Sequence, residues 1–278
     1  PWGFGAVDPN GGTSMLLVLA EALGELAEQG CGPRRSIMIA HWDAEEYGII
    51  GSTEWVEEFL PELTSGAIAY INADSAVSGP NFNTSSSPSL KQPILDAIQD
   101  VSYAGEDRSI YEWWAERTDD GLPTMGNLGG GSDHVAFYTH AGIPSASLGS
   151  GGRSGIYHSN YDNFAWYERF GDAEWVFGPM IARADGLLAL RFANADLLPY
   201  DVTRYAVDTR THVQTLIDVA TQRGVDVNLS RLLDATRDLD VAATALNDAR
   251  AQRVAAGSLS AGEAKRINSA FIGLEKAW

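Results

Sequence analysis

Apolar residues recur every three or four positions near the start of the chain, between two glycine-rich stretches. Residues 1–12 are irregular and rich in glycine, and Gly30 and Gly32-Pro33 follow the repeat. This spacing is typical of one face of an amphipathic helix, and glycine and proline end helices. The pattern therefore predicts a helix whose buried face is formed by Leu16, Leu19, Ala20, Leu23, Leu26 and Ala27.

Three short apolar runs are bounded by charged or turn-forming residues instead. They cover residues 36–42, 67–74 and 143–148. Runs of this length are too short for a helix and are typical of strands buried on both faces of a parallel sheet. A helical pattern over residues 52–60 separates the first two runs, which predicts parallel pairing through a right-handed crossover. Residues 75–88, rich in Ser, Asn and Pro, are predicted as a loop.

From about residue 195 the patterns are helical alone. Ser260 and Glu263 are spaced as a capping box that starts a last helix. A narrow apolar seam, typical of a helix that packs against another helix, is formed by Leu232, Ala235, Leu239, Ala242, Leu246 and Ala249. We therefore predict an α/β domain over residues 1–194, with a mostly parallel sheet flanked by helices, and a small all-helical bundle over residues 195–278.

The composition of the chain limits the kinds of molecule that it is expected to bind. The 278 residues carry a formal net charge of −18, which disfavours nucleic acid and anionic membranes. Cys31 is the single cysteine of the sequence, which excludes an internal disulfide framework and a thiolate metal cluster. The sequence has no run of about 18 apolar residues, so no membrane segment is predicted.

Acidic residues stand directly after two of the predicted strands. Glu45 and Glu46 follow the run at 36–42, and Asp74 ends the run at 67–74. Ligands bind at this carboxyl edge of an open α/β sheet. Adjacent glutamates repel each other, which is tolerated if one binds a cation and the other carries a proton for part of a reaction cycle. A solvated acidic loop is the alternative for a lone glutamate pair.

Two further candidate ligands, Asp8 and His158, lie in loops rich in glycine. With Glu46 and Asp74 they offer carboxylate oxygen and imidazole nitrogen, which bind zinc at about 2.0 to 2.2 Å.

The remaining histidines are weaker candidates for a functional role. His41 lies on a predicted buried strand and is expected to be a satisfied core residue. His134 is expected either to shape the floor of the cleft or to be purely structural.

Five motifs, in this order along the chain, resemble the glutamate carboxypeptidase II branch of the co-catalytic zinc peptidases, which includes the transferrin receptor. They are Trp42-Asp-Ala-Glu-Glu-Tyr-Gly48, Gly51-Ser-Thr-Glu-Trp55, Tyr70-Ile-Asn-Ala-Asp74, Gly131-Ser-Asp-His134 and Tyr157-His-Ser159. The resemblance implies a zinc aminopeptidase-like catalytic domain that lacks its first strands and apical insertion. It also implies an incomplete transferrin-receptor-like dimerisation domain, so the chain is expected to be truncated at both ends.

The same resemblance implies roles for individual residues. Asp8 would bridge two zinc ions, Glu46 and His158 would complete the ligands of one ion, and Asp74 would serve the other. Glu45 would be the general base that takes a proton from a metal-bridging water. Tyr157, Gly131 and Ser132 would contact a peptide substrate. The implied enzyme is a metallopeptidase, a carboxypeptidase or an aminopeptidase acting on short peptides.

The chain departs from the family at two points. A further histidine ligand belongs to a His-x-Asp motif just before the segment that is Trp2-Gly-Phe-Gly5 here, and the chain begins at Pro1. We therefore expect two Zn²⁺ in the parent protein, a partial or empty site in this fragment, and activity only in the parent. Where glutamate carboxypeptidase II carries an arginine pair, Ser145 and Ser147 offer no charge, so a preference for an acidic residue before the cut is not expected.

An alternative from a different class is a catalytically inactive homodimeric receptor or scaffold of the same family. Both readings predict a homodimer through the helical domain. The presence of all five candidate metal and base residues favours the enzyme, because acidic groups that lie close together are unfavourable unless a metal ion neutralises part of their charge. The resemblance also implies a secreted, periplasmic or membrane-anchored location, with any signal or anchor outside this chain.

Overall fold

The computed structural model describes residues 3–257 and 259–277. The expectations that rest on Pro1, Trp2 and Trp278 concern residues outside this part. The described elements follow one another in this order: α1 (Asn10–Glu28), η1 (Glu45–Tyr47), α2 (Ile50–Glu58), α3 (Leu60–Gly66), β1 (Tyr70–Asn72), β2 (Asn81–Ser86), η2 (Pro88–Leu90), α4 (Lys91–Ile98), α5 (Ile110–Ala115), η3 (Ala136–His140), β3 (Ser145–Gly151), α6 (Phe164–Trp166), η4 (Tyr167–Gly171), α7 (Phe177–Asn194), α8 (Thr203–Gln222), α9 (Ser230–Ala255) and α10 (Ala261–Glu275).

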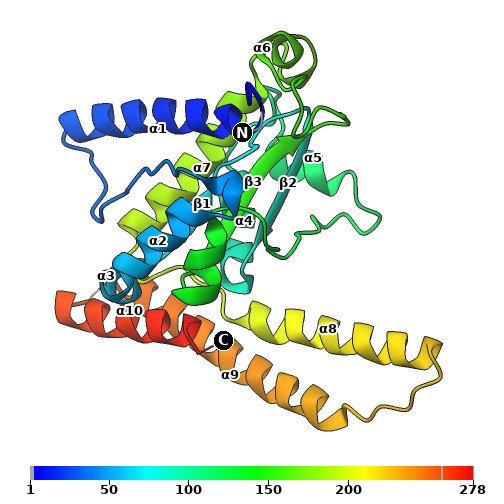
Figure 1. The fold of residues 1–278 in the computed structure, drawn as a ribbon. Coiled ribbons are helices and arrows are strands. Elements are labelled where there is room, and N and C mark those ends of the chain that lie inside the picture. Colours follow the sequence, from blue (N-terminus) through cyan, green and yellow to red (C-terminus); the bar gives the residue numbers. More distant parts are fainter. Residues whose placement is uncertain (1–2, 258, 278) are drawn as a thin grey trace.

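The described strands form one mixed sheet in the order β1-β3-β2, at the centre of the molecule (Figure 1). β1 runs parallel to β3, with Ile71 opposite Ala146, and β2 runs antiparallel to β3, with Thr84 opposite Leu148. The helix α7 packs against β3 and against α1. An α/β fold with a small sheet flanked by helices, followed by a helical end, confirms the predicted fold class. The division into two domains at residue 195 stays a prediction.

The loop predicted for residues 75–88 is wrong in its second half, because residues 81–86 form β2. Their burial alternates along the strand, with Phe82, Thr84 and Ser86 inside. Two of these three buried side chains are polar, and the hydroxyl of Ser86 lies 3.3 Å from the sulfur of Met125. The strand therefore lacks the apolar alternation by which strands are recognised in a sequence.

The strand predicted for residues 36–42, buried on both faces, is also wrong. The segment has no regular secondary structure and its exposure alternates, with Ile37 and Ile39 half-buried and Met38 exposed. No backbone hydrogen bond joins these residues to any other part of the chain that the structure describes. An apolar run alone does not make a strand, which also needs a partner, and no backbone hydrogen bond joins this segment to the outer edge of β1.

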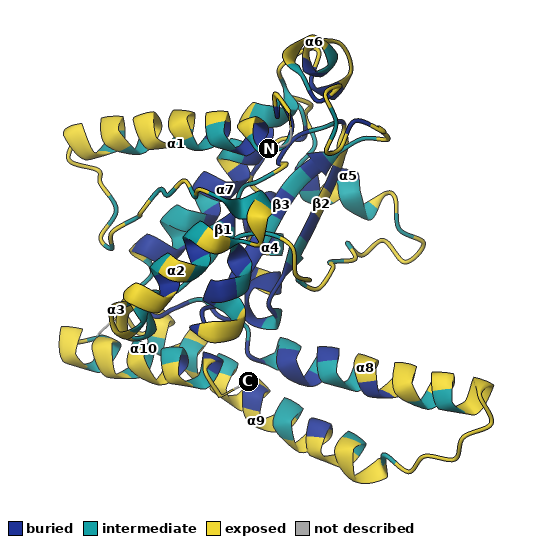
Figure 2. Cartoon of the chain, in the orientation of Figure 1, coloured by how far each residue is buried: buried dark blue, intermediate teal, exposed yellow. Residues whose placement is uncertain are grey.

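Two hydrophobic clusters hold the first part of the chain together, and Figure 2 shows buried residues concentrated in and around the sheet. The larger cluster joins α4, α7 and β3 through fully buried residues such as Ile94, Leu148 and Ile181. The smaller one packs α2 and η3 beside β1, where the ring of Tyr70 stacks on that of Phe137 at 4.1 Å. These clusters fix the ends of β1 and β3 from which the site is built.

The first turn of α1 lies directly on the end of β1. The backbone N–H of Gly12 donates to the carbonyl of Asp74 at 3.0 Å. A Cβ at Gly12 would lie only 2.0 Å from the carbonyl oxygen of Ala73. No side chain fits in that space, so glycine at this position allows the helix and the strand end to meet. The contact brings Asp8, which precedes α1, next to Asp74.

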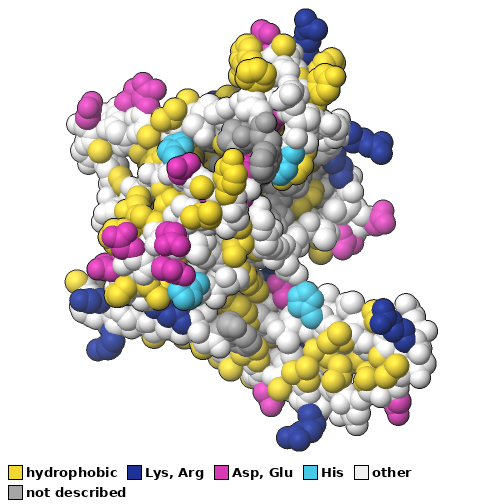
Figure 3. Space-filling model, in the orientation of Figure 1, with side chains coloured by type: hydrophobic (Ala, Val, Ile, Leu, Met, Phe, Trp, Pro, Cys, Tyr) yellow, Lys and Arg dark blue, Asp and Glu magenta, His cyan; other side chains and the backbone are white. Residues whose placement is uncertain are grey.

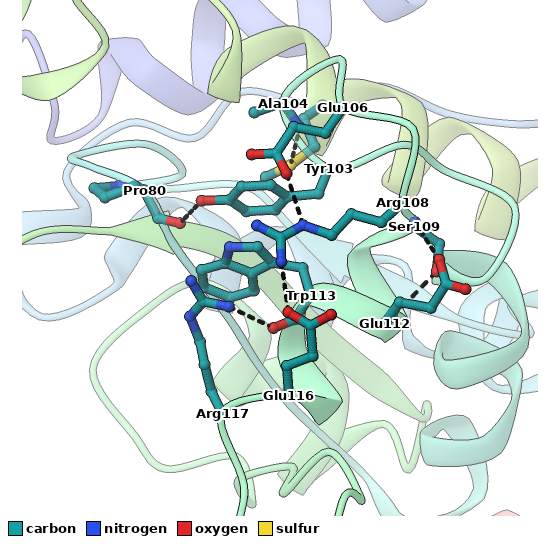
Figure 4. A network of polar contacts seen from close by, with 11 residues as sticks. Pro80, Tyr103, Ala104, Glu106, Arg108, Ser109, Glu112, Trp113, Glu116 and Arg117 are labelled. Carbon is teal, nitrogen blue, oxygen red and sulfur yellow. Dashed lines mark hydrogen bonds and ion pairs between the residues drawn. The ribbon is translucent and has the colours of Figure 1, made fainter.

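The long segment at 105–131 is more ordered than a loop. It contains α5, whose start is capped by Ser109 and Glu112, and Figure 4 shows how polar contacts tie it together. Arg108 forms ion pairs with Glu106 and Glu116 at 2.6 and 2.5 Å. Trp113 is buried and stacks on Tyr103 at 4.2 Å, while Trp114 meets Phe82 edge-on at 5.2 Å. The tryptophan pair therefore packs in or against the core.

The C-terminal helices extend to one side of the sheet, where α8 and α9 pack on each other (Figure 1). Most of the apolar seam of α9 is exposed, including Leu232 and Leu246, and Figure 3 shows hydrophobic side chains gathered on α8 and α9. Among the described helices, none has the length and apolar character needed to cross a membrane.

Buried polar contacts fasten these helices to the α/β part. The ammonium of Lys91 lies 2.7 Å from the Asp208 carboxylate on α8 and donates to the side-chain carbonyl of Asn127 at 2.7 Å. Nearby, Ser89 and Tyr205 both donate to the buried Glu275 carboxylate of α10, at 2.9 and 2.6 Å. Such links tie the glycine-rich loop after Asn127 to α8.

We expect Gly12→Ala to lower the free energy of unfolding by about 1 to 3 kcal/mol, the usual cost of forcing a carbon into a filled site. Gly24→Ala is the matched control in the same helix, because a Cβ there meets no atom within 4 Å. It should raise stability by about 0.5 to 1 kcal/mol, since alanine favours helix interiors over glycine. Urea unfolding of both variants measures the difference, and equal effects would refute the close contact.

Burial raises the pKa of Glu275 above its ordinary value of 4.5, although hydrogen bonds from Tyr205 and Ser89 oppose the rise. Above pH 4.5 the folded protein then binds more protons than the unfolded chain, so this group lowers stability as pH rises toward its folded pKa. The stability of Glu275→Gln relative to wild type should therefore increase with pH over that window. Urea unfolding at a series of pH values tests this, and exposed Glu57→Gln should show no such trend.

Candidate metal centre

Four separate segments bring acidic and imidazole side chains to the carboxyl end of β1. Asp8 lies in the turn before α1, and Glu45 and Glu46 lie in η1. Asp74 lies two residues after β1, and His158 lies in the loop after β3. The backbone is strained at two of these places, with φ of 57° at Ala44 and 54° at His158. Non-glycine residues with positive φ are uncommon and cluster at functional sites.

Three of the four predicted metal ligands form one group. Nε2 of His158 lies 3.2 Å from a carboxylate oxygen of Asp8 and 3.3 Å from one of Glu46. One ligand atom from each of the three lies within 4.8 Å of the others, which is close enough to hold a metal ion. Asp74 lies outside this group, although it is close enough to Asp8 to raise the pKa of that carboxyl group.

Crowding of the carboxyl groups has an electrostatic consequence. Burial, followed by the charge and hydrogen bond of Asp74 and the charge of Glu46, raises the pKa of Asp8 to about 7, against the opposing effect of His158. Burial also raises the pKa of Glu45, with Asp74 and Asp133 as the next causes. Carboxyl groups placed so close together require a proton or a cation to neutralise part of their charge.

Two supporting residues were not predicted from the sequence in these roles. The buried carboxylate of Asp162 accepts the backbone N–H groups of Val7 and Asp8, at 2.7 and 3.0 Å. The hydroxyl of Ser132, predicted to contact substrate, donates to Asp74 at 2.7 Å and accepts from the side-chain amide of Asn72 at 2.9 Å. No spacing in the sequence indicates the role of Asp162, because the backbone groups that it accepts from lie far earlier in the chain.

The other predicted residues lie around this group. Tyr157 is exposed and its ring stacks on His158 at 3.7 Å. Gly131 is exposed at the end of the glycine run, with φ of 94°. His134 is buried and lies 2.8 Å from the carbonyl of Gly129, which fits a structural role. His41 is exposed rather than buried, so its prediction as a core residue is wrong, because segment 36–42 is not enclosed on both faces.

A small polar pocket adjoins Asp74. Its volume is about 280 Å³ and its lining includes Asn72, Asn83, Ser85 and Ser147. Asp74 also lines this pocket, so it opens next to the metal-binding group. Ser145 is fully buried, and its hydroxyl donates to the carbonyl of Ile143. Of the two serines singled out in the sequence, only Ser147 therefore faces this space.

Comparisons with known proteins agree on one family. Residues 1–174 match the model of Peptidase family M28. The chain is 42% identical to the probable glutamate carboxypeptidase LAMP1 of Arabidopsis thaliana, over 87% of this chain and 35% of that protein. It is 34% identical to the aminopeptidase NAALADL1 of Rattus norvegicus, over 88% of this chain and 36% of that protein. The chain thus spans about a third of the length of these relatives.

Among solved structures, the aminopeptidase from Aneurinibacillus sp. strain AM-1 matches 55% of this chain and 32% of that chain. The TM-score is 0.39 and the sequence identity is 20%. A likeness of this extent supports no conclusion on function.

Ser132→Ala tests whether this hydroxyl supports a metal ligand. Removing a hydrogen bond to a ligating carboxylate typically lowers metal affinity about 10- to 100-fold, so we expect a loss in this range for Zn²⁺, measured by competition with a chelator. Ser75→Ala, an exposed position next to Asp74, is the matched control and should leave the affinity unchanged. If Ser132→Ala binds Zn²⁺ as tightly as the wild type, Ser132 does not support a metal ligand, and contact with the substrate is the role that remains for it.

Proposed function

This chain belongs to Peptidase family M28, and we propose that it forms the main part of the catalytic centre of a zinc-dependent exopeptidase that hydrolyses short peptides. The observation that carries the proposal is the approach of Asp8, Glu46 and His158 to within ligand distance of one another, beside Glu45. The relatives include proteins named as a probable glutamate carboxypeptidase and as an aminopeptidase. The proposal therefore covers cleavage at either end of the peptide.

The residues present fit zinc. Two carboxylates and an imidazole are ligands that zinc accepts, and the raised pKa of Asp8 indicates a group that would gain from a nearby cation. We propose that the whole protein holds two Zn²⁺, with Asp8 shared between them. Glu46 and His158 would complete one site and Asp74 would contribute to the other. Zinc bound there would polarise the scissile carbonyl and lower the pKa of a water molecule.

We assign the proton transfer to Glu45. It follows Ala44 in the same turn as Glu46, and burial together with the neighbouring carboxyl groups raises its pKa, which favours the acceptance of a proton. In this role Glu45 takes a proton from the attacking water and delivers it to the leaving amine. Burial of the surrounding carboxyl groups strengthens the electrostatic effects on which this transfer depends.

The polar pocket beside Asp74 suggests which substrates fit. Its lining of asparagine and serine side chains offers hydrogen bonds, and Asp74 and Ser132 stand at its edge. Among its lining residues no lysine or arginine occurs. We propose that the residue next to the scissile bond is small and neutral, with Tyr157 and the backbone at Gly131 as further contacts.

We also propose that the intact protein is a homodimer through its C-terminal helices. The exposed apolar seam of α9, with Leu232 and Leu246 about 40% exposed, supports this because packed helix pairs bury such a stripe. An inactive receptor-like dimer would share this surface. Zinc content of the intact protein separates the two functions, since a scaffold without metal would contain close to none.

Glu45→Gln should lower kcat of the intact protein about 10²- to 10⁴-fold, the range supplied by a general acid or base. The variant should retain its zinc content, because the glutamine does not replace a proposed ligand. Glu54→Gln, an exposed acid on α2, is the matched control and should keep full activity. Peptide hydrolysis followed by amine release measures both, and a kcat within tenfold of wild type in Glu45→Gln would refute the assignment.

A further inference from the structure

Ser52 and Asp133 form a hydrogen bond that the proposed function leaves without a role. The hydroxyl of Ser52, in the first turn of α2, donates to the carboxylate of Asp133 at 2.6 Å. Ser52 is fully buried, and Asp133 is half-buried next to Ser132, just after the glycine run. The two residues lie 81 positions apart in the sequence, so this bond joins segments that only the folded chain brings together.

The first turn of α2 is closely packed against the turn that carries Glu45. The N–H of Ile49 donates to the carbonyl of Glu45 at 2.7 Å, and the N–H of Gly51 donates to the carbonyl of Asp43 at 3.1 Å. A Cβ at Gly51 would lie 2.3 Å from that carbonyl oxygen of Asp43, so the two turns meet without free space between them. A shift of Ser52 would therefore move the turn of Glu45 as well.

The backbone of this turn also needs contacts that hold it in shape. The angle φ is 57° at Ala44 and 59° at Ile49. Left-handed backbone of this kind is unfavourable for residues other than glycine, above all for a β-branched one. Such conformations persist only where the surrounding structure holds them. The bond from the adjoining turn of α2 to Asp133 is one contact that can do so.

Asp133 is fixed from the other side, at the end of β1. Its neighbour Ser132 donates to the carboxylate of Asp74 at 2.7 Å. Burial, and then the charges of Asp74 and Asp133, raises the pKa of Glu45, so Asp133 also lies close to that carboxyl group. The bond between Ser52 and Asp133 thus connects the acidic segment after β1 with the acidic segment before α2.

We propose that Ser52 and Asp133 are positioning residues, whose hydrogen bond holds Glu45 in place relative to Asp74. The inference rests on the proposed function, in which Glu45 transfers the proton and Asp74 contributes to a zinc site. A general base must lie within hydrogen-bond reach of the group that it deprotonates. A misplacement of about 1 Å can lower a rate about 10²-fold, so a bond that fixes this distance contributes to catalysis without touching the substrate.

Amide hydrogen exchange tests the position of the turn without any peptidase activity. In the intact protein, Ser52→Ala should speed exchange about 2- to 10-fold in peptides that cover residues 43–51, the effect of one lost hydrogen bond on local opening. Asp133→Ala removes the acceptor instead and should give the same increase. Asp133→Asn keeps an oxygen that can accept and should exchange as slowly as wild type. Exchange that stays at the wild-type rate in Ser52→Ala and Asp133→Ala would overturn the proposal.

Kinetics of the intact protein test whether the pair acts through Glu45. Ser52→Ala should lower kcat about 10- to 100-fold, while KM and zinc content stay unchanged. In the Glu45→Gln background the same substitution should lower kcat less than about threefold, because residues that act through one group are not additive. A loss of kcat by the same factor in both backgrounds, or a loss that follows the zinc content, would overturn the proposal.

Ser89→Ala is the matched control for the loss of a buried hydroxyl. Ser89 is also fully buried and donates to a carboxylate, that of Glu275 in α10, at 2.9 Å. This variant should keep the wild-type kcat and the wild-type exchange at residues 43–51, and equal effects in Ser89→Ala and Ser52→Ala would overturn the proposal. Circular dichroism checks that the variants are folded. If Glu45→Gln keeps the wild-type kcat, the proposed base is wrong, and exchange still decides whether the pair holds the turn.

Discussion

The contact between the first turn of α1 and the end of β1 determines where the acidic groups of this protein lie. Gly12 approaches Ala73 so closely that no Cβ fits, and its N–H bonds to the carbonyl of Asp74. The carboxyl group of Asp8 is thereby held near that of Asp74 in a half-buried place, where burial and then the charge of Asp74 raise the pKa of Asp8. The fold thus places carboxyl groups that repel one another close together, and a bound cation would reduce that repulsion.

Much of the architecture follows from local pattern. The helix over Asn10–Glu28 agrees with the apolar periodicity, although Ala20 and Ala27 of its predicted buried face are exposed. β1 and β3 lie within two of the predicted runs, but the parallel pairing predicted between the runs at 36–42 and 67–74 is wrong, because β1 pairs with β3 instead. The failures have physical causes. β2 fills buried positions with Thr84 and Ser86, which a hydrophobic pattern cannot register. Segment 36–42 has the composition of a strand, but strand formation depends on a partner, which composition does not specify.

At the site, the rule that ligands bind at the carboxyl ends of strands applies to Asp74, which follows β1, whereas Glu45 and Glu46 follow a segment that forms no strand. His158 and Asp8 were singled out by their glycine-rich loops and by resemblance, and the structure places both beside Glu46. The supporting contacts were beyond the sequence, because Asp162 reaches back to the backbone at Val7 and Ser132 joins Asn72 to Asp74. Such bonds connect positions far apart in the chain. The roles of the individual residues in catalysis stay predictions.

The ion pair between Lys91 and Asp208 joins α8 to the segment that precedes the glycine-rich loop, since Lys91 also holds Asn127. Asn127 in turn lies 3.3 Å from the ring of His212, one helical turn further along α8. Any displacement of α8 must either break these buried bonds or carry Asn127 with it. The glycine-rich loop lines the polar pocket beside Asp74, so a shift of α8 would reach the wall of that pocket through Asn127.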